Sequence, residues 1–186
     1  INQGTHHSNL IEAVPTYIRL GNEKVWNNEN NAWIVLGRDR PGDDHSGYGA
    51  RGDTQAGSID IVCGRMAPTP CSEAQCDPDF KVDAARIYIS QKTDVDANFG
   101  IVEGEVGSFR PFERPGSAVA MKADAVRLMA RDGGIKLVTG IDPMNSQGGP
   151  IGPARYIGID LIAGNDDSDM QPLVKGDNMA KCIRKL

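Results

Sequence analysis

A ten-residue string that occurs twice most constrains how this 186-residue chain can fold. The first copy is residues 81–90 (KVDAARIYIS) and the second is residues 122–131 (KADAVRLMAR), with Lys, Asp, Ala and Arg at matching positions. In each copy polar and apolar residues alternate, which is the period-2 pattern of a β-strand with its apolar side chains turned inward. The repeat therefore predicts two equivalent strands.

A second pair of strings shares a different pattern. Residues 57–64 (GSIDIVCG) and 157–164 (IGIDLIAG) each carry Ile-Asp, two aliphatic residues, a small residue and Gly. Every copy in the two pairs has one aspartate within an apolar strand, so we expect these aspartates to hold equivalent positions. They are Asp60, Asp83, Asp124 and Asp160. Such recurrence favours a structural use, in which the carboxylate accepts backbone N–H groups at a bend.

The spacing of turn-forming residues predicts an all-β fold. The chain contains 22 Gly and 11 Pro, spread along its length, which is typical of many short strands joined by turns. We expect these strands to stack as a β-solenoid, a prism or a sandwich, in which each unit buries its face only against the next. Besides the repeated strings, short strands are predicted at 16–20, 23–26, 33–37, 118–121, 125–130 and 135–139.

The predicted organisation has three parts. A polar, Asn-rich N-terminal arm spans 1–31, a β-repeat domain spans 32–170, and the start of a C-terminal helix or stem spans 171–186. Three loop insertions are expected within the repeat domain, at 38–55, 66–79 and 141–155. In the last part Asp177 is expected to cap a helix with Met179, Ile183 and Leu186 on one face. The chain stops before that helix reaches a useful length, so we expect more protein to follow.

The charge balance limits the kinds of molecule that this chain is expected to bind. With 20 basic and 25 acidic residues the net charge is −5, which disfavours direct binding to nucleic acid or to an anionic membrane. The sequence also lacks a run of 18 apolar residues that could cross a bilayer. The expected partners are therefore proteins, including further copies of this chain.

Four cysteines are too few and too scattered for a secreted disulfide framework. Cys63 lies in an apolar run and is predicted to be a buried small hydrophobe. Cys71 and Cys76 lie in a Pro-rich loop at a spacing that permits a local disulfide or half of a metal site. A four-thiolate site needs a second close pair, which the sequence lacks.

Two stretches could carry a site. Asp94, Asp96 and Asn98 have the alternate spacing of calcium-loop ligands, although Phe99 stands where an EF-hand requires Gly. A plain Asx turn is the alternative. The loop after residue 37 gathers side chains that could bind a ligand: Arg38, Asp39, His45, Tyr48 and Arg51.

That loop admits two further interpretations. Tyr48 with Trp33 could stack on a sugar ring, as in a carbohydrate- or receptor-binding module. His45 with Asp39, Asp43 or Asp44 could act as a general acid and base, but no serine or cysteine lies in a recognisable nucleophile turn. We therefore expect neither an enzyme nor a cofactor.

Residues 117–140 (SAVAMKADAVRLMARDGGIKLVTG) resemble strand repeats in structural proteins of tailed-bacteriophage virions, including trimeric spike-type β-helices. Residues 37–42 (GRDRPG), 47–49 (GYG) and 53–60 (DTQAGSID) are also similar to phage structural proteins. The chain lacks the sustained Val-x-Gly octad of the long needle form. The resemblance implies a non-enzymatic virion part, either a head decoration protein or a baseplate or spike component, assembled in the host cytoplasm with other virion proteins. We expect a homotrimer.

Overall fold

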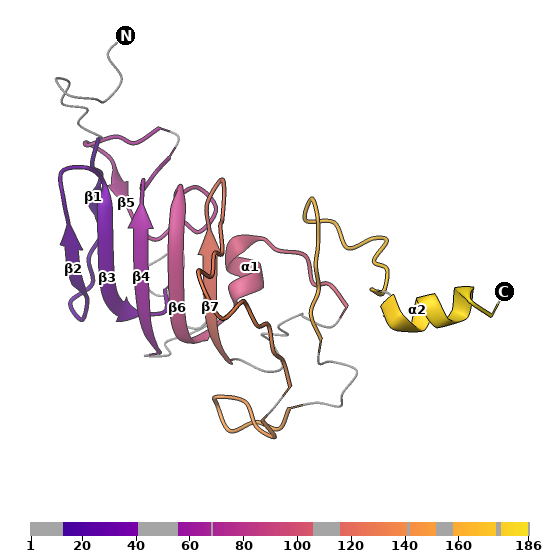
Figure 1. Cartoon of the computed structure of the whole chain (residues 1–186). Helices are drawn as coiled ribbons and strands as arrows, with labels where there is room; N and C mark the ends of the chain where they lie inside the picture. The colour runs from indigo at the N-terminus through magenta and orange to yellow at the C-terminus, as the bar shows by residue number, and fades with distance from the viewer. Residues whose placement is uncertain are drawn as a thin grey trace, which may run out of the picture.

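The computed structural model describes residues 13–40, 56–67, 69–105, 116–140, 142–151, 158–173 and 176–185. Its centre is a five-stranded antiparallel sheet in the order β2-β3-β4-β6-β7 (Figure 1). The strands are β2 (Lys24–Asn27), β3 (Ala32–Arg38), β4 (Gly57–Cys63), β6 (Ala85–Thr93) and β7 (Gly116–Lys122). The all-β prediction is confirmed at the level of a mainly β fold. The described strands form two open sheets, and they do not show the predicted solenoid or prism.

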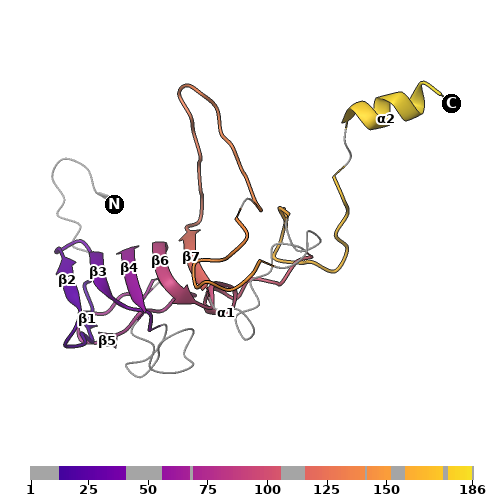
Figure 2. The ribbon, with the colours of Figure 1, turned by 90° about the horizontal axis from the view of Figure 1, so that it is seen from below.

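A second layer covers one side of this sheet. β1 (Thr16–Tyr17) pairs in parallel with β5 (Gln75–Cys76), and a single-turn helix, α1 (Val95–Phe99), lies on the same side (Figure 2). We call the side facing this layer the inner face and the opposite side the outer face. The predicted N-terminal arm is therefore wrong for residues 13–31, because β1 lies in the second layer, β2 joins the main sheet, and Glu23 is buried.

The side-chain alternation of the central strands is opposite to the predicted one. In β4, Asp60 and Val62 are buried on the inner face, whereas Ile59, Ile61 and Cys63 are turned outward. Neighbouring residues of a strand point to opposite faces, so the burial of Asp60 fixes the exposure of Cys63. The prediction that Cys63 is a buried hydrophobe is wrong for this reason.

The first copy of the repeated string forms a strand and the second does not. β6 begins at Ala85 and is paired on both sides, by β4 and by β7. Lys122 ends β7, and residues 123–140, which are all described, contain neither helix nor strand and are exposed. A strand needs a neighbour for its backbone N–H and C=O groups, and the described chain offers this segment none. The strands predicted at 125–130 and 135–139 are therefore wrong.

We call residues 123–140 the arm. Figure 2 shows the arm rising from the end of β7, away from the sheet, on the side opposite to β1, β5 and α1. The arm therefore projects on the side of the outer face. It turns back at Asp132, Gly133 and Gly134, and both glycines have positive φ angles, which suit a tight reversal.

The residues after the arm contain little regular structure. The second copy of the Ile-Asp string has no strand in its described part, and Asp160 accepts a hydrogen bond from the backbone N–H of Glu105 instead. Asn165 also attaches this segment to residues 100–102, through Gly100 and Val102. Among the described residues of the predicted repeat domain, β-structure thus ends at Lys122, apart from an isolated bridge between Met144 and Pro150.

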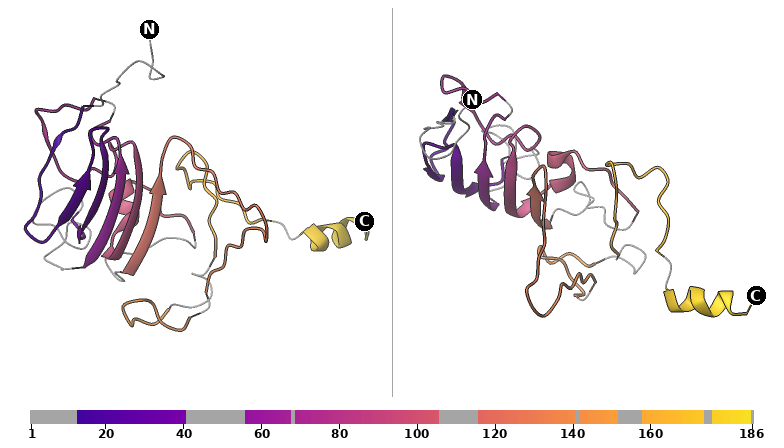
Figure 3. Two further views of the ribbon diagram at one scale, coloured as in Figure 1. Left: turned by 60° about the vertical axis from the view of Figure 1, so that its left-hand side comes forward. Right: turned by 45° about the horizontal axis from the view of Figure 1, so that its top comes forward.

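The C-terminal helix is confirmed as α2 (Gly176–Ile183), which begins one residue before the predicted cap, Asp177. Both views in Figure 3 show α2 set apart from the sheet. Among the helices of the described ranges, none has the length and apolar character needed to cross a membrane.

Candidate functional site

The inner face carries a cluster of buried ion pairs instead of a purely aliphatic core. Asp60 of β4 bonds Arg86 of β6, with Nε 2.8 Å from Oδ1. Arg65 and Asp83 come from the turns between β4 and β6, and each arginine contacts both aspartates. Asp83 also accepts the backbone N–H of Met66 at 2.9 Å. These bonds attach the covering turns to two central strands.

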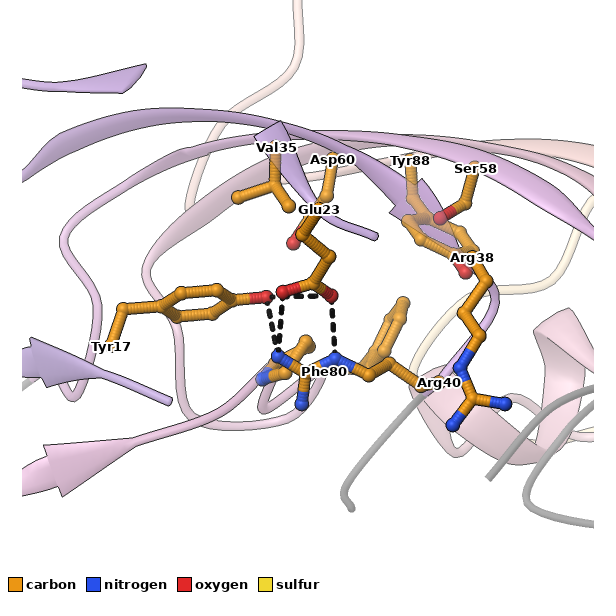
Figure 4. A pocket seen from close by; sticks show the side chains of 10 residues that line it. Tyr17, Glu23, Val35, Arg38, Arg40, Ser58, Asp60, Phe80 and Tyr88 are labelled. Atoms are coloured by element: carbon orange, nitrogen blue, oxygen red, sulfur yellow. Dashed lines mark hydrogen bonds and ion pairs between the residues drawn. The ribbon is translucent and has the colours of Figure 1, made fainter. Parts of the chain in front are cut away.

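A second buried group joins the N-terminal residues to the end of β3. Arg40 Nε lies 2.6 Å from Glu23 Oε1, and its Nη2 donates to the hydroxyl of Tyr17 at 2.8 Å (Figure 4). Arg40 also donates to the carbonyl of Ile18. The side chains of both Arg40 and Glu23 are almost fully buried. This pair anchors β1 against the main sheet.

Aromatic rings surround the guanidinium groups. Arg65 lies 4.7 Å from the ring centroid of Tyr17 and 5.3 Å from that of Trp33, and Arg86 lies 4.3 Å from that of Phe80. A guanidinium over a ring face is stabilised electrostatically while it remains dehydrated. The rings therefore supply contacts that water would otherwise make.

Burial shifts several pKa values in the same direction. Burial raises the pKa of Tyr88, and the nearby Asp39 carboxylate raises it further. Burial also raises the pKa of Tyr17, against the opposing effect of Arg40. The pKa of Asp83 is raised by burial, while Arg86 opposes the shift. Phenols with raised pKa values stay protonated at neutral pH, so here they serve as hydrogen-bonding groups and not as nucleophiles.

The buried cluster contains equal numbers of arginines and carboxylates, and it has no room for a substrate. Three arginines, Arg40, Arg65 and Arg86, face three carboxylates, Glu23, Asp60 and Asp83. The hollow beside Arg40 has room for about one water molecule. One nitrogen of each arginine lacks a protein partner, and a water in such a hollow could satisfy the one on Arg40. The arrangement can hold the two layers together, but it offers no room for a substrate.

The predicted binding loop is only partly described. Arg38 ends β3, and Asp39 is buried, where it accepts hydrogen bonds from the Tyr88 hydroxyl and from Ser90 Oγ. His45, Tyr48 and Arg51 lie outside the described residues. Trp33 is buried on the inner face and donates its indole N–H to Asn31, so its ring is not available for stacking on a sugar.

The predicted calcium ligands lie on a helix turn. Asp94 caps α1 and accepts the backbone N–H of Ala97, while Asn98 donates to Thr93 Oγ1. Asp96 lies in the first turn, and helix residues two apart do not face the same side. The extended calcium loop is therefore wrong, and a local cap stands in its place. Across the described ranges, no group of three His, Cys, Asp or Glu side chains is placed to hold a metal ion.

The suggested local disulfide is also not formed. Cys71 is exposed, Cys76 is buried, and both are free thiols. Burial raises the pKa of the Cys76 thiol to about 11. Cys76 therefore behaves as a small buried side chain at neutral pH.

The outer face carries the feature that sequence reasoning missed. Two cross-strand rows run across all five strands, and the strand register places their members side by side. Every member is a large apolar side chain except Lys24 at the β2 edge. The first row holds Trp26, Ile34, Ile61, Ile87 and Met121. The second row holds Lys24, Leu36, Ile59, Ile89 and Val119. All of these residues are exposed except Leu36, which is half-buried.

These rows form a contiguous apolar surface. Between them and the end of the sheet lies an open depression of about 470 Å³, lined in part by Leu36, Ile59 and Ile89. Soluble proteins rarely leave an apolar patch of this extent uncovered unless it contacts another molecule. The candidate functional site is therefore the outer face. Its sequence signal is the set of isoleucines at alternate positions, but that pattern does not say which side of the sheet is covered.

No protein-family model, curated protein or solved structure matches the chain.

Proposed function

We propose that this chain is a non-enzymatic structural component of a tailed-phage virion, a decoration, baseplate or spike-type protein that contacts neighbouring subunits. The observation that carries the proposal is the uncovered outer face with its two apolar rows. A surface of this kind is typical of a contact with another molecule, and packing against a protein would remove its apolar area from water. The resemblance of the sequence of residues 117–140 to phage strand repeats is the reason for naming a virion as the assembly, although only residues 117–122 of this segment lie in a strand.

The inner face supports the same role. Its ion pairs tie β4 and β6 to the covering turns, and Arg40, which follows β3, bonds Glu23 and the Tyr17 hydroxyl of β1. Because these bonds stabilise the fold on the inner face, the aliphatic side chains of the outer face can take part in contacts between subunits. We propose a homotrimer that assembles with other virion proteins in the host cytoplasm.

The alternative, a carbohydrate- or receptor-binding module, has less support. It needs an exposed aromatic ring beside the loop after residue 37, and Trp33 is buried under Arg65. The structural role is therefore the function that the described residues favour.

Two measurements test the proposal. Light scattering behind size-exclusion chromatography should give a mass of three chains, each of 20.0 kDa. Quantitative mass spectrometry of purified phage particles should find the chain at a fixed copy number. A monomer at tens of micromolar that is also absent from particles would rule the proposal out.

A further inference from the structure

We propose that the arm of one copy packs on the outer face of a second copy, so that each chain both gives an arm and receives one. This inference rests on the proposed structural role and names the partner of its contact surface. Three observations carry it: the side-chain pattern of the arm, the side of the sheet on which the arm projects, and the match in size between arm and face.

The arm has the pattern of a strand pair without a partner. Its first limb carries Val126 and Leu128 two residues apart, and its second limb carries Ile135 and Leu137 at the same spacing. All four are exposed, at 47 to 65 %. If the limbs pair across the turn at Gly133 and Gly134, period-2 alternation brings these four side chains to one face of a hairpin.

The other side of the same hairpin is more polar. It carries Arg127, Arg131 and Lys136 beside Met129 and Val138. An amphipathic hairpin needs an apolar surface for one side only. The outer face of the sheet is such a surface, and it carries one charged residue, Lys24, among its ten row positions.

The arm and the outer face lie on the same side of the molecule. In Figure 2 the arm rises from β7, at one edge of the sheet, and does not extend back over β2, β3 or β4. Its starting point is fixed, because Lys122 Nζ donates to the backbone carbonyls of Phe80, Lys81 and Asp83. An arm that leaves the body in this direction presents its apolar side chains to a neighbouring copy.

The sizes agree. Five strands span about 20 Å, and a limb of nine extended residues reaches about 30 Å, so the arm can cross the whole sheet. Two rows with their side chains give each surface a footprint of roughly 300 Å². One such contact buries about 600 Å² when both surfaces are counted, which is the size of a weak interface, so stable assembly requires that the contacts close in a ring in which each chain makes two of them. A contact between two different surfaces of the same chain is heterologous, and such contacts generate rings when the rotation closes.

The test uses two variants that each disable one side of the contact. The arm variant is Leu128→Asp with Leu137→Asp, and the face variant is Ile61→Asp with Ile87→Asp. Matched controls are Met129→Asp with Val138→Asp on the other side of the arm, and Ile18→Asp with Ile101→Asp away from the outer face. Leu137 and Val138 are both 65 % exposed, and Ile18 and Ile87 are both 40 % exposed.

Each disabled variant should elute as a 20.0 kDa monomer with an unchanged circular dichroism spectrum, whereas the controls keep the wild-type mass. An equimolar mixture of the two disabled variants should form a one-to-one complex, because each supplies the surface that the other lacks. We expect the dissociation constant of either variant alone to rise at least 100-fold. If an aspartate pair unfolds the protein, serine at the same positions replaces it.

The outcomes distinguish packing of the arm on the outer face from direct packing of two outer faces. An arm variant that keeps the wild-type mass while the face variant loses it would overturn the inference in favour of direct face-to-face packing. Two monomeric variants that fail to complement each other would overturn it as well. Either result leaves the structural role standing, because the wild-type chain still assembles. A monomeric wild-type chain that is absent from particles removes the structural role itself.

Discussion

Asp60 and Arg86 form an ion pair of 2.8 Å between adjacent strands on the covered side of the sheet, at positions where a small β protein usually buries aliphatic side chains. The isoleucines next to them in sequence, Ile59, Ile61, Ile87 and Ile89, face the other way. Buried charges of this kind are tolerated when they are paired and hydrogen-bonded. Ion pairs on the inner face connect the two layers, and the isoleucines on the outer face remain exposed for contacts with another subunit.

The first prediction separates the recurrent aspartates. Asp83→Asn should lower the free energy of unfolding by about 3 kcal/mol, because it leaves Arg65 and Arg86 with one buried carboxylate between them. Asp124→Asn, at the matching position of the second string, should change it by less than about 0.5 kcal/mol, since Asp124 is exposed. Urea denaturation of both variants at one protein concentration measures the difference. Equal effects would show that the two strings are equivalent after all.

The second prediction concerns close packing beneath β3. A Cβ atom on Gly37 would lie 2.7 Å from Cγ of the buried Glu23, so Gly37→Ala should lower the free energy of unfolding by about 1–3 kcal/mol. Gly57→Ala is the matched control, because no heavy atom lies within 4 Å of its added Cβ and its residue pairs with the neighbouring Arg38. Thermal unfolding should show a lower midpoint for the first variant only. A Gly37→Ala protein as stable as the control would contradict the burial of Glu23.

The third prediction is a loss of stability in alkaline solution. Burial raises the pKa of Cys76 from 9.0 to about 11, so the folded protein holds this proton more tightly than the unfolded chain does. Its contribution is fully present below pH 9 and is lost as the pH rises through 11. The urea midpoint should therefore fall between pH 9 and 11. The raised pKa of Tyr17 acts in the same direction.

Two substitutions isolate the cysteine contribution. Cys76→Ala should make the alkaline fall of the urea midpoint shallower. Cys63→Ala, at an exposed thiol on the outer face, should leave the slope as in the wild type. The same slope in all three proteins would argue against the burial of Cys76.

The fourth prediction uses Cys63 as a reporter of the outer face. In a Cys71→Ser, Cys182→Ser background, Cys63 should react slowly with a maleimide in the assembled protein and at least tenfold faster in the arm variant Leu128→Asp with Leu137→Asp. Cys76 is buried and should stay slow in both. Peptide mapping by mass spectrometry resolves the two sites. A Cys63 rate that does not depend on the arm would place the arm away from this part of the face.

Local patterns were sufficient for much of the strand content. The alternating string at 85–90 lies within β6, the apolar run at 33–37 lies within β3, and the Ile-Asp string at 57–63 is β4. The C-terminal helix also followed from its 3.6-residue periodicity. These elements have local signals, because turn residues bound them and side-chain periodicity marks them.

The equivalence of the repeated strings could not be predicted, because strand formation depends on neighbours. Residues 85–90 have β4 on one side and β7 on the other, while residues 123–131 have no neighbouring strand in the described chain. Of the four aspartates expected to be equivalent, Asp60 and Asp83 meet in one ion cluster, and Asp124 is exposed. The two similar strings therefore lie in different structural surroundings, and only the first forms a strand.

The sequence by itself determined that the chain is mainly β and where β3, β4 and β6 lie, since alternation and turn residues act over a few positions. Only the tertiary structure decided which side of each strand is covered. Alternation gives two faces without naming the inner one. The choice depends on Arg65, Phe80 and Asp83, which the fold brings beneath the sheet from the covering turns. That choice buries the charges and leaves the isoleucines for a partner.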